Sequence, residues 1–400
     1  MATSAEQIRN WKGPAVLSYG YRPFFLGGAL CAALSLPIWI MMFFGEEILP
    51  LATDPISWHT HSLLFSYLWA VVAGFLTTAV PNWTGRFPIV GWPLLSLFGL
   101  WLLSVVISLV SGLMPLWLIF LCDLIFPVVF TIAIGREIIV GRNWRNLKVL
   151  ILVMLLLIAN AIFDYEAYLG DGGFDGYGAR LALGVAVMLI ALVGGRVVPS
   201  FTRNWLTKKN AKYMPASHNL YDQCVMVLTA PVLILWVVFP DNQWIGWLCL
   251  IIGILQFIRL CRWQSWQTMH EPLVWVLHIG YLFVPLGFIA IWFSASGLFD
   301  VQRSYAQHVW MAGAIGLMTL AIMSRASLGH AGRPLTVGWP VATLYFMLII
   351  SVILRVVAGI MDNSTPLLHS ASTLWCLAFL GFVILYWKIL TKPREPRVKN

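Results

Sequence analysis

The chain has 400 residues, of which 60% are hydrophobic and only 10% are charged. Soluble domains carry about 25% charged residues, so this composition excludes a soluble fold. A bilayer core about 30 Å thick is crossed by roughly 20 apolar residues in a helix, and backbone groups in lipid must pair within the chain. The sequence therefore predicts an all-α fold, a polytopic membrane helical bundle.

Twelve apolar runs, bounded by turn residues, follow one another with short connections. We expect them to form the transmembrane helices of a single integral membrane domain that covers residues 1–400. The expected spans are 23–44, 57–81, 92–112, 115–138, 147–169, 179–199, 220–239, 244–262, 273–293, 305–325, 337–360 and 366–389.

Positive charges predict the orientation of these spans, because cytoplasmic loops are enriched in lysine and arginine. With a cytoplasmic N-terminus, all of the 25 lysine and arginine residues except Arg180, Arg303 and Arg355 fall on the inner side. We therefore expect a bacterial-type inner membrane with both termini in the cytoplasm. The most basic connection, 203–218, fits the same rule, and contact with anionic membrane lipid is the alternative. Topology thus explains the net charge of +9, which does not indicate a nucleic-acid partner.

One sequence pattern returns at an offset of 247 residues. Six positions match at this offset: His61 with His308, Gly85-Arg86 with Gly332-Arg333, and Gly91-Trp92-Pro93 with Gly338-Trp339-Pro340. A weaker third copy, which lacks the histidine, runs through 198–202 and is offset by 118 from 80–84. The matches predict an internal repeat.

The two histidines of the repeat, His61 and His308, both lie near the outer ends of their spans. Two neutral imidazoles at one depth on facing helices are what an axially bis-ligated haem requires. Polar groups in lipid are costly and usually functional, although satisfied polar residues at a helix interface are the alternative. No CxxCH motif occurs, so the expected cofactor is a b-type haem (haem b) without covalent attachment.

A second metal centre is expected near His59. Residues two apart on a helix point about 200° apart around its axis, so His59 and His61 can serve two sites on opposite sides of the helix. Copper favours imidazole and thioether ligands, and His278 and His330 are further candidate metal ligands at the inner side. The remaining histidines, His218, His270 and His369, are interpreted as exposed loop residues.

Three arginines, Arg86, Arg196 and Arg333, each close a span at the inner face next to a glycine. A planar guanidinium suits a carboxylate, so they are candidates to bind haem propionates. Anchoring at the inner membrane face is the alternative.

Asp123 lies in the middle of the fourth expected span. An intramembrane carboxylate is a functional candidate by default, with either a partner in another span or a role in proton relay. Asp123 is therefore the candidate catalytic residue, and Asn160 and Asp164 in the fifth span are weaker candidates of the same kind.

At these residues the chain resembles the NnrS family over nearly its whole length. The matching pieces are Tyr21-Arg22-Pro23-Phe24-Phe25, Trp58-His59-Thr60-His61, the run 74–86 (GFLTTAVPNWTGR), the run 194–205 (GGRVVPSFTRNW), Leu277-His278-Ile279-Gly280-Tyr281 and the run 325–335 (RASLGHAGRPL). The resemblance implies a haem- and copper-containing membrane protein linked to nitric oxide metabolism or nitrosative-stress tolerance, with nitric oxide as the small-molecule ligand. One residue departs from the family pattern: Ser62 stands where the family usually has glutamate after the second histidine.

A broader likeness connects the twelve spans and the weak repetition to the haem-copper oxidase architecture, as an analogy of fold only. Three functions remain open: an oxidoreductase that binds or reduces nitric oxide at haem, a transporter or sensor without turnover, and an assembly protein that hands on haem or copper. The electron donor, the reaction product, the number of metals and the oligomeric state do not follow from the sequence.

Overall fold

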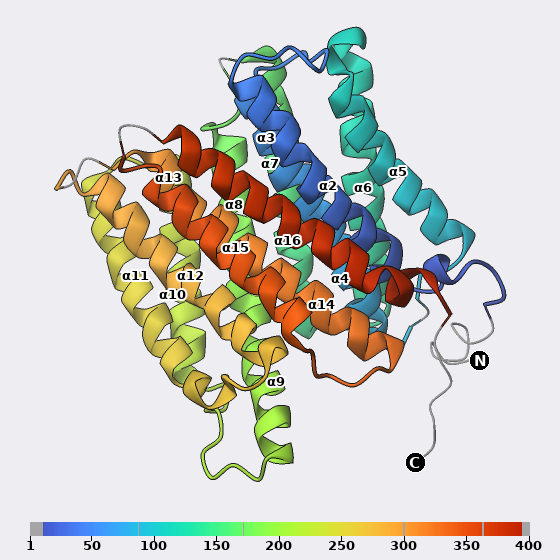
Figure 1. Cartoon of the computed structure of the whole chain (residues 1–400), viewed down its shortest axis with the longest axis vertical. Helices are drawn as coiled ribbons and strands as arrows, with labels where there is room; N and C mark the ends of the chain where they lie inside the picture. The colour runs from blue at the N-terminus through green and yellow to red at the C-terminus, as the bar shows by residue number, and fades with distance from the viewer. Residues whose placement is uncertain (1–10, 87, 171, 299–300, 362–363, 394–400) are drawn as a thin grey trace. The chain divides into compact units, whose positions relative to one another are not determined.

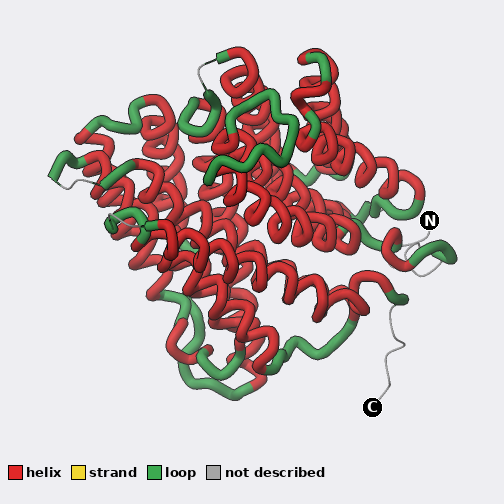
Figure 2. Tube along the Cα trace, turned by 45° about the horizontal axis from the view of Figure 1, so that its top comes forward, coloured by secondary structure: helices red, strands yellow, loops and turns green. Residues whose placement is uncertain are grey.

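The computed structural model describes residues 11–86, 88–170, 172–298, 301–361 and 364–393. Every regular element in these ranges is helical, and Figure 2 shows helices joined by short loops. Within the described ranges, twelve helices are long and apolar enough to cross a membrane. The predicted all-α bundle of twelve spans is therefore confirmed, and the chain is a multi-pass membrane protein.

The chain divides into two compact units. Unit 1 comprises Met1–Ala182, Ala326–Pro334 and Phe379–Asn400, and unit 2 comprises Leu183–Arg325 and Leu335–Ala378. The elements up to the start of unit 2 are η1 (Ala15–Leu17), α2 (Tyr21–Phe43), α3 (Pro55–His61), η2 (Ser62–Tyr67), α4 (Leu68–Thr84), α5 (Trp92–Leu109), η3 (Ser111–Leu113), α6 (Leu116–Val140), η4 (Trp144–Asn146), α7 (Leu147–Leu169) and α8 (Tyr177–Leu189). The elements that follow are η5 (Ile190–Gly194), α9 (Gly195–Lys208), α10 (Leu220–Val238), α11 (Gln243–Cys261), η6 (Ser265–Thr268), α12 (Pro272–Ala295), α13 (Arg303–His308), η7 (Val309–Leu317), α14 (Met318–Ala331), α15 (Trp339–Val357) and α16 (Thr365–Thr391).

Local sequence sets the two ends of the second span. The Asp54 carboxylate accepts hydrogen bonds from the backbone N–H groups of Ile56 and Ser57, both at 2.9 Å, and Pro55 occupies the first helical position. Gly85 ends α4 with a φ of 68°, a left-handed conformation that glycine adopts without steric cost. The repeated Gly-Arg pair thus begins with a helix-terminating residue.

Unit 1 is held together by close helix approaches at small residues. A Cβ added at Gly74 of α4 would lie 2.6 Å from the Phe25 ring of α2, and one added at Gly28 would lie 3.0 Å from the Ala70 methyl group. Interfaces of membrane helices rely on such small residues because lipid supplies no hydrophobic driving force between helices. Helices α5 and α6 also pack together in this unit, as Figure 1 shows.

In unit 2, α12 is the central packing element and contacts both α11 and η7. The Trp310 indole fills the space over Gly287, where a Cβ would clash with the ring, and its Nε1–H donates to the Val284 carbonyl at 3.0 Å. A buried tryptophan requires such a partner for its N–H group. This contact fixes how η7 lies against α12.

Among the residues that the structure describes, three spans contain a π-helical segment: η2 in the second, η5 in the sixth and η7 in the tenth. The segments η2 and η7 begin at Ser62 and Val309, which are separated by the 247-residue offset of the sequence repeat. π-Helical turns are rare and occur frequently at functional sites. The repeat therefore extends to the backbone conformation, and His61 and His308 each directly precede a π-helical segment.

These same three spans are longer than predicted. They run over Pro55–Thr84, Tyr177–Lys208 and Arg303–Ala331, whereas the sequence predicted 57–81, 179–199 and 305–325. The sixth and tenth helices continue well past their apolar runs, and α9 ends in the amphipathic stretch SFTRNWLTK. An amphipathic helix end contains polar residues, so it does not belong to a uniformly hydrophobic run, and prediction from such runs places the helix end too early.

Candidate functional site

His61 lies at the centre of a buried polar cluster in unit 1. The histidine ends α3, Asp123 comes from the first third of α6, and Asn160 and Asp164 lie one turn apart on α7. None of the four residues is more than 5% exposed. The structure thus brings together the second, fourth and fifth spans through the polar residues that the sequence singled out within them.

Asp123 accepts three hydrogen bonds. His61 Nε2 lies 3.0 Å from Asp123 Oδ2, Asn160 Nδ2 donates to the same oxygen at 2.7 Å, and the Ser104 hydroxyl donates to Oδ1. An ionised carboxylate only accepts hydrogen bonds, so His61 Nε2 carries the proton and Nδ1 holds the lone pair. The Nδ1 atom lies 3.5 Å from the Ser66 hydroxyl, at the outer limit of a hydrogen bond.

Asn160 connects the two carboxylates of the cluster. Its amide oxygen accepts from Trp69 Nε1 at 3.0 Å, which points its NH2 group at Asp123 and, at 3.4 Å, at Asp164. Asp164 is fully buried, and two carboxylates in a low-dielectric interior need a proton or a cation nearby. Sequence reasoning did not identify Trp69, Ser66 or Ser104 as members of this cluster, because tryptophan and serine are common in membrane spans.

The cluster has the geometry of a cation site. One ligand atom from each of His61, Asp123 and Asp164 lies within 4.8 Å of the other two. One imidazole and two carboxylates form a donor set suited to a divalent transition metal. In a second possible arrangement, Asp123 does not bind the metal but accepts a hydrogen bond from His61 Nε2–H and so orients the ring, as carboxylates do for metal-bound histidines. The metal would then be bound by His61 Nδ1.

Ser62, the departure from the family pattern, begins η2 and is buried. It brings no carboxylate to the second span. Asp123 and Asp164 supply carboxylates to the neighbouring His61 from two other helices. A glutamate after the histidine is therefore not required for an acidic environment at this position.

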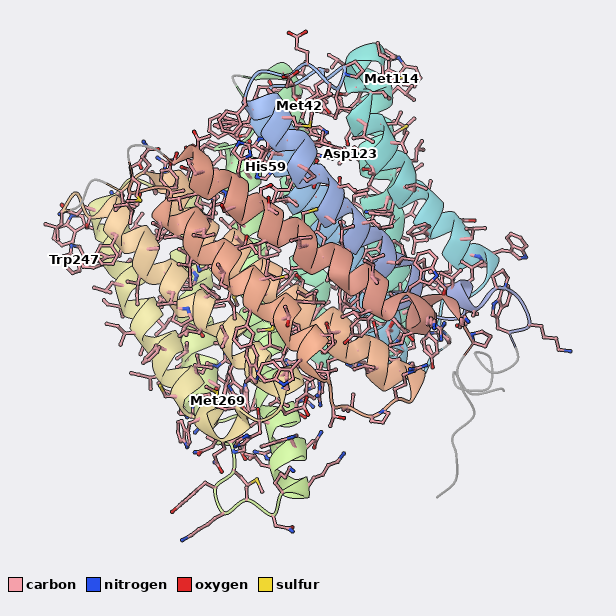
Figure 3. The ribbon with its side chains drawn as sticks, viewed as in Figure 1. Met42, His59, Met114, Asp123, Trp247 and Met269 are labelled. Atoms are coloured by element: carbon pink, nitrogen blue, oxygen red, sulfur yellow. The ribbon has the colours of Figure 1, made fainter. Side chains whose placement is uncertain are left out.

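His59 contacts a different neighbour, as the predicted angle between the two rings requires. Its imidazole stacks on the Trp39 indole with ring centroids 4.1 Å apart and an interplanar angle of 23°. Trp39 packs in the same apolar cluster as Met42. Figure 3 labels His59, Met42 and Asp123 in the upper part of unit 1.

His330 lies far from His59 within unit 1. Its ring packs beside Tyr21 at the start of α2, with centroids 5.5 Å apart, whereas Trp39 and His59 meet near the end of that helix. The 18 residues between Tyr21 and Trp39 correspond to about 27 Å of helix. These two histidines therefore cannot bind the same ion.

His308 belongs to unit 2 and is half-buried. Its Nδ1 lies 2.6 Å from the Ser304 carbonyl oxygen one turn earlier, so Nδ1–H donates to that carbonyl and Nε2 holds the lone pair. An Nδ1–H···O=C bond of this kind sets the tautomer in which Nε2 is the metal-binding atom. Arg355 lies beside the ring, with Nη2 3.4 Å from Nδ1.

His278 of α12 presents a buried nitrogen in unit 2. The Thr202 hydroxyl donates to the Val198 carbonyl at 2.9 Å, so it accepts from His278 Nε2–H at 2.8 Å. The other nitrogen, Nδ1, holds the lone pair and has no hydrogen-bond partner among the residues described. His278 is 3% exposed, so this nitrogen is shielded from water as well.

The three candidate arginines lie in different surroundings. Arg86 Nε donates to Glu137 Oε2 of α6 at 2.6 Å, so this guanidinium has an acidic partner within the chain. Arg196 is a half-buried residue of α9, and Arg333 lines a cavity in unit 1. The Glu137 partner of Arg86 was not among the expectations from the sequence.

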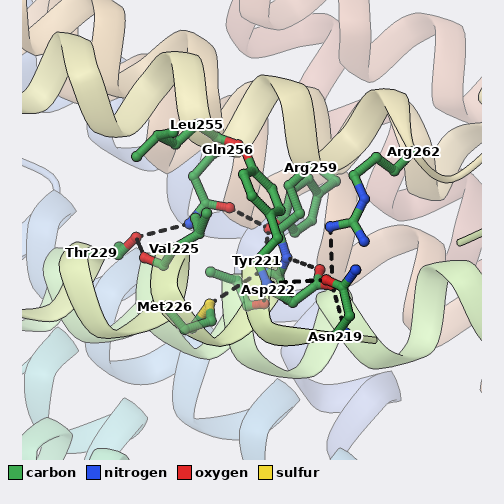
Figure 4. Close-up of polar contacts among 12 residues, drawn as sticks. Asn219, Tyr221, Asp222, Val225, Met226, Thr229, Leu255, Gln256, Arg259 and Arg262 are labelled. Atoms are coloured by element: carbon green, nitrogen blue, oxygen red, sulfur yellow. Dashed lines mark hydrogen bonds and ion pairs between the residues drawn. The ribbon is translucent and has the colours of Figure 1, made fainter. Parts of the chain in front are cut away.

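A second buried polar network, in unit 2, was also missed. Arg259 Nε donates to Asp222 Oδ1 at 2.9 Å, and its Nη1 donates to Tyr281 Oη at 2.9 Å and to the Ala191 carbonyl of η5 at 3.0 Å. Figure 4 shows how Arg262 and Gln256 extend the network from α11. Arg259 is one of the charges that the sequence assigned to the inner side, and its side chain is only 1% exposed within its span.

The signal that could have revealed this network was available. Asp222 and Arg259 are opposite charges inside two consecutive apolar runs, and charges within membrane spans usually pair with one another. Asp222 also receives the Asn219 backbone N–H in the capping box that begins α10. The network fixes α10, α11, α12 and a π-helical segment together, so its role is structural.

The family model described as NnrS protein matches residues 15–394 of the chain. No curated protein matches it.

Proposed function

The chain belongs to the NnrS family, and on this premise we propose that it is a haem- and copper-binding membrane protein that acts in the cellular response to nitric oxide. Family membership supports a nitric-oxide-response membrane protein. Binding of haem and copper, and redox activity toward nitric oxide, are the finer parts of the proposal.

One observation carries the haem part. His61 and His308 occupy the same place in two copies of a repeat, and each is the last residue before a π-helical segment. Their tautomers fit a metal ligand, because hydrogen bonds to Asp123 and to the Ser304 carbonyl leave a lone pair on His61 Nδ1 and His308 Nε2. Each of these nitrogens is a candidate ligand for the iron of a b-type haem.

The copper part rests on the other histidines. His59 stacks on Trp39, which packs in the same apolar cluster as Met42, and imidazole and thioether are ligands that copper favours. The lone pair of His278 Nδ1 makes this residue the candidate for a further site. His330, separated from His59 by the length of α2, would belong to a different site.

Haem iron, when bound, supplies the position at which nitric oxide coordinates. The residues around His61 contribute protons and orientation. Asp123 fixes the ring, and Asn160 links Asp123 to the fully buried Asp164, which gives a hydrogen-bonded connection between two carboxylates. A reduction of nitric oxide would take a proton from this connection and electrons from a separate donor.

An optical spectrum of the purified protein, combined with elemental analysis, tests the proposal. We expect a Soret band with resolved α and β bands that shifts when nitric oxide is added, together with copper. In His59→Ala the copper content should fall while the haem spectrum is retained. A folded, monodisperse protein with neither haem nor copper would contradict the proposal and favour a transporter or sensor.

The orientation of the chain is a separate prediction. We propose an inner-membrane protein with both termini and the 203–218 connection in the cytoplasm, since only Arg180, Arg303 and Arg355 of the lysines and arginines fall on the outer side. Alkaline phosphatase, which is active only outside the cytoplasm, should be inactive when fused after residue 212 and active when fused after residue 242. The reverse pattern would show that the topology is inverted.

A further inference from the structure

A basic cavity opens at the ends of three helices of unit 1. It has a volume of about 270 Å³ and is lined by Arg22, Ala331, Arg333, Lys388, Ile389, Lys392 and Pro393. These residues come from the start of α2, the end of α14 with the residue pair that follows it, and the end of α16. Four of the seven lining residues are positively charged and none is acidic.

Arg22 forms the buried wall of the cavity and is only 2% exposed. Its Nη1 donates to the backbone carbonyls of Lys392 at 2.7 Å and Leu390 at 3.2 Å, contacts that hold the guanidinium against the end of α16. Its Nε is buried and makes no hydrogen bond to any described residue. Two neutral carbonyl groups orient this cation but do not neutralise it.

The repeat provides an internal comparison. Arg86 and Arg333 are equivalent positions, and Arg86 is paired with Glu137 at 2.6 Å. Arg333 lines the cavity together with Arg22, Lys388 and Lys392. Like charges gathered in one small cavity repel one another, so the cavity favours the binding of an anion.

We propose that this cavity binds a phosphate group, and that an anionic phospholipid headgroup is its source. Arginine and lysine side chains at the ends of transmembrane helices form the basic pockets in which such headgroups bind. Guanidinium groups donate in a planar fork that matches phosphate oxygens, and lysines add point charges. A volume of 270 Å³ accommodates a headgroup and is below the usual range for larger ligands.

The two exposed lysines provide the test, because their replacement leaves the buried Arg22 in place. Wild type and a Lys388→Gln/Lys392→Gln variant are compared by native mass spectrometry with phosphatidylglycerol and with phosphatidylcholine. We expect wild type to bind phosphatidylglycerol more tightly than phosphatidylcholine. The double variant should bind phosphatidylglycerol on the order of thirtyfold more weakly, since each basic residue at an anionic headgroup contributes roughly fivefold.

The matched control is Lys208→Gln/Lys209→Gln, which removes two lysines at the basic end of α9 outside the cavity. This control should keep wild-type affinity for phosphatidylglycerol. A thermal shift with inorganic phosphate in detergent gives the second arm: stabilisation of wild type but not of the cavity variant would identify free phosphate as a source. Equal loss of phosphatidylglycerol binding in both double variants, or equal affinity of wild type for the two lipids, would overturn the proposal.

Discussion

Replacing either His61 or His308 with alanine is expected to abolish the low-spin signal of the proposed haem. Both residues precede a π-helical segment at equivalent places in the repeat. In the proposed haem protein, loss of one of these imidazoles would leave the iron high-spin or release the haem, because no CxxCH sequence in the chain would retain it covalently. The measurement is the electron paramagnetic resonance and optical spectrum of each variant, with haem quantified after acid-organic extraction.

The control for this experiment is His218→Ala, because His218 is exposed in a connecting loop. Its spectrum should equal that of wild type. Asp123→Asn tests the role of the Asp123 charge while His61 itself stays in place. Asparagine retains an acceptor for His61 Nε2–H but removes the negative charge. It should retain haem with an altered reduction potential. Wild-type spectra in both His61→Ala and His308→Ala would show that the repeat does not provide the haem ligands.

The largest expected effect on stability follows from Arg259→Met. This substitution removes the buried cation paired with Asp222, a carboxylate that is 3% exposed, and it removes the donors to Tyr281 and to the Ala191 carbonyl. Removing one partner of a buried ion pair costs about 3–5 kcal/mol. We expect a lower unfolding midpoint when the detergent-solubilised protein is titrated with a denaturing detergent.

Arg262→Met serves as the comparison, because Arg262 contacts the same carboxylate at 3.1 Å but its side chain is 21% exposed. A partly exposed ion pair contributes about 0–1 kcal/mol, so this variant should unfold close to wild type. Equal midpoints for the two variants would contradict the assignment of Arg259 as the central residue of the network. The Asp222 carboxylate would then be satisfied by Arg262 and the Asn219 backbone alone.

The twelve spans were predictable because the bilayer imposes length and apolarity on every helix independently of its neighbours. The lengths of the sixth and tenth spans were not, since α9 and α14 continue through polar residues whose helical conformation depends on packing. The π-helical segments were also not predictable. Both Ser62–Tyr67 and Val309–Leu317 are largely apolar runs, and apolarity alone does not distinguish a π-helical from an α-helical segment.

The candidate site was predictable in its members more than in its contacts. Asp123 was identifiable as a carboxylate in the middle of a span, and His61 as a repeated histidine. That these two side chains meet depends on which faces of α3 and α6 are turned toward each other. When a span is apolar on all sides, the spacing of its apolar residues does not indicate which side faces a neighbouring helix. The same reason accounts for the unpredicted contacts of Arg86 with Glu137 and of Arg259 with Asp222.

The π-helical segment η2 has a consequence for the evolution of the second span. A segment of this kind holds one residue more than a regular α-helix would use for the same number of turns, and one residue corresponds to about 100° of rotation. The additional residue therefore sets the directions in which His61, before the segment, and Gly74, after it, face around the helix axis. With it, His61 contacts Asp123 and Gly74 accommodates the Phe25 ring. After a one-residue deletion within 62–67, the helix could make the contact of His61 with Asp123 or the contact of Gly74 with Phe25, but not both. Insertions and deletions in this family should accordingly be excluded from the second and tenth spans and gather in the loops.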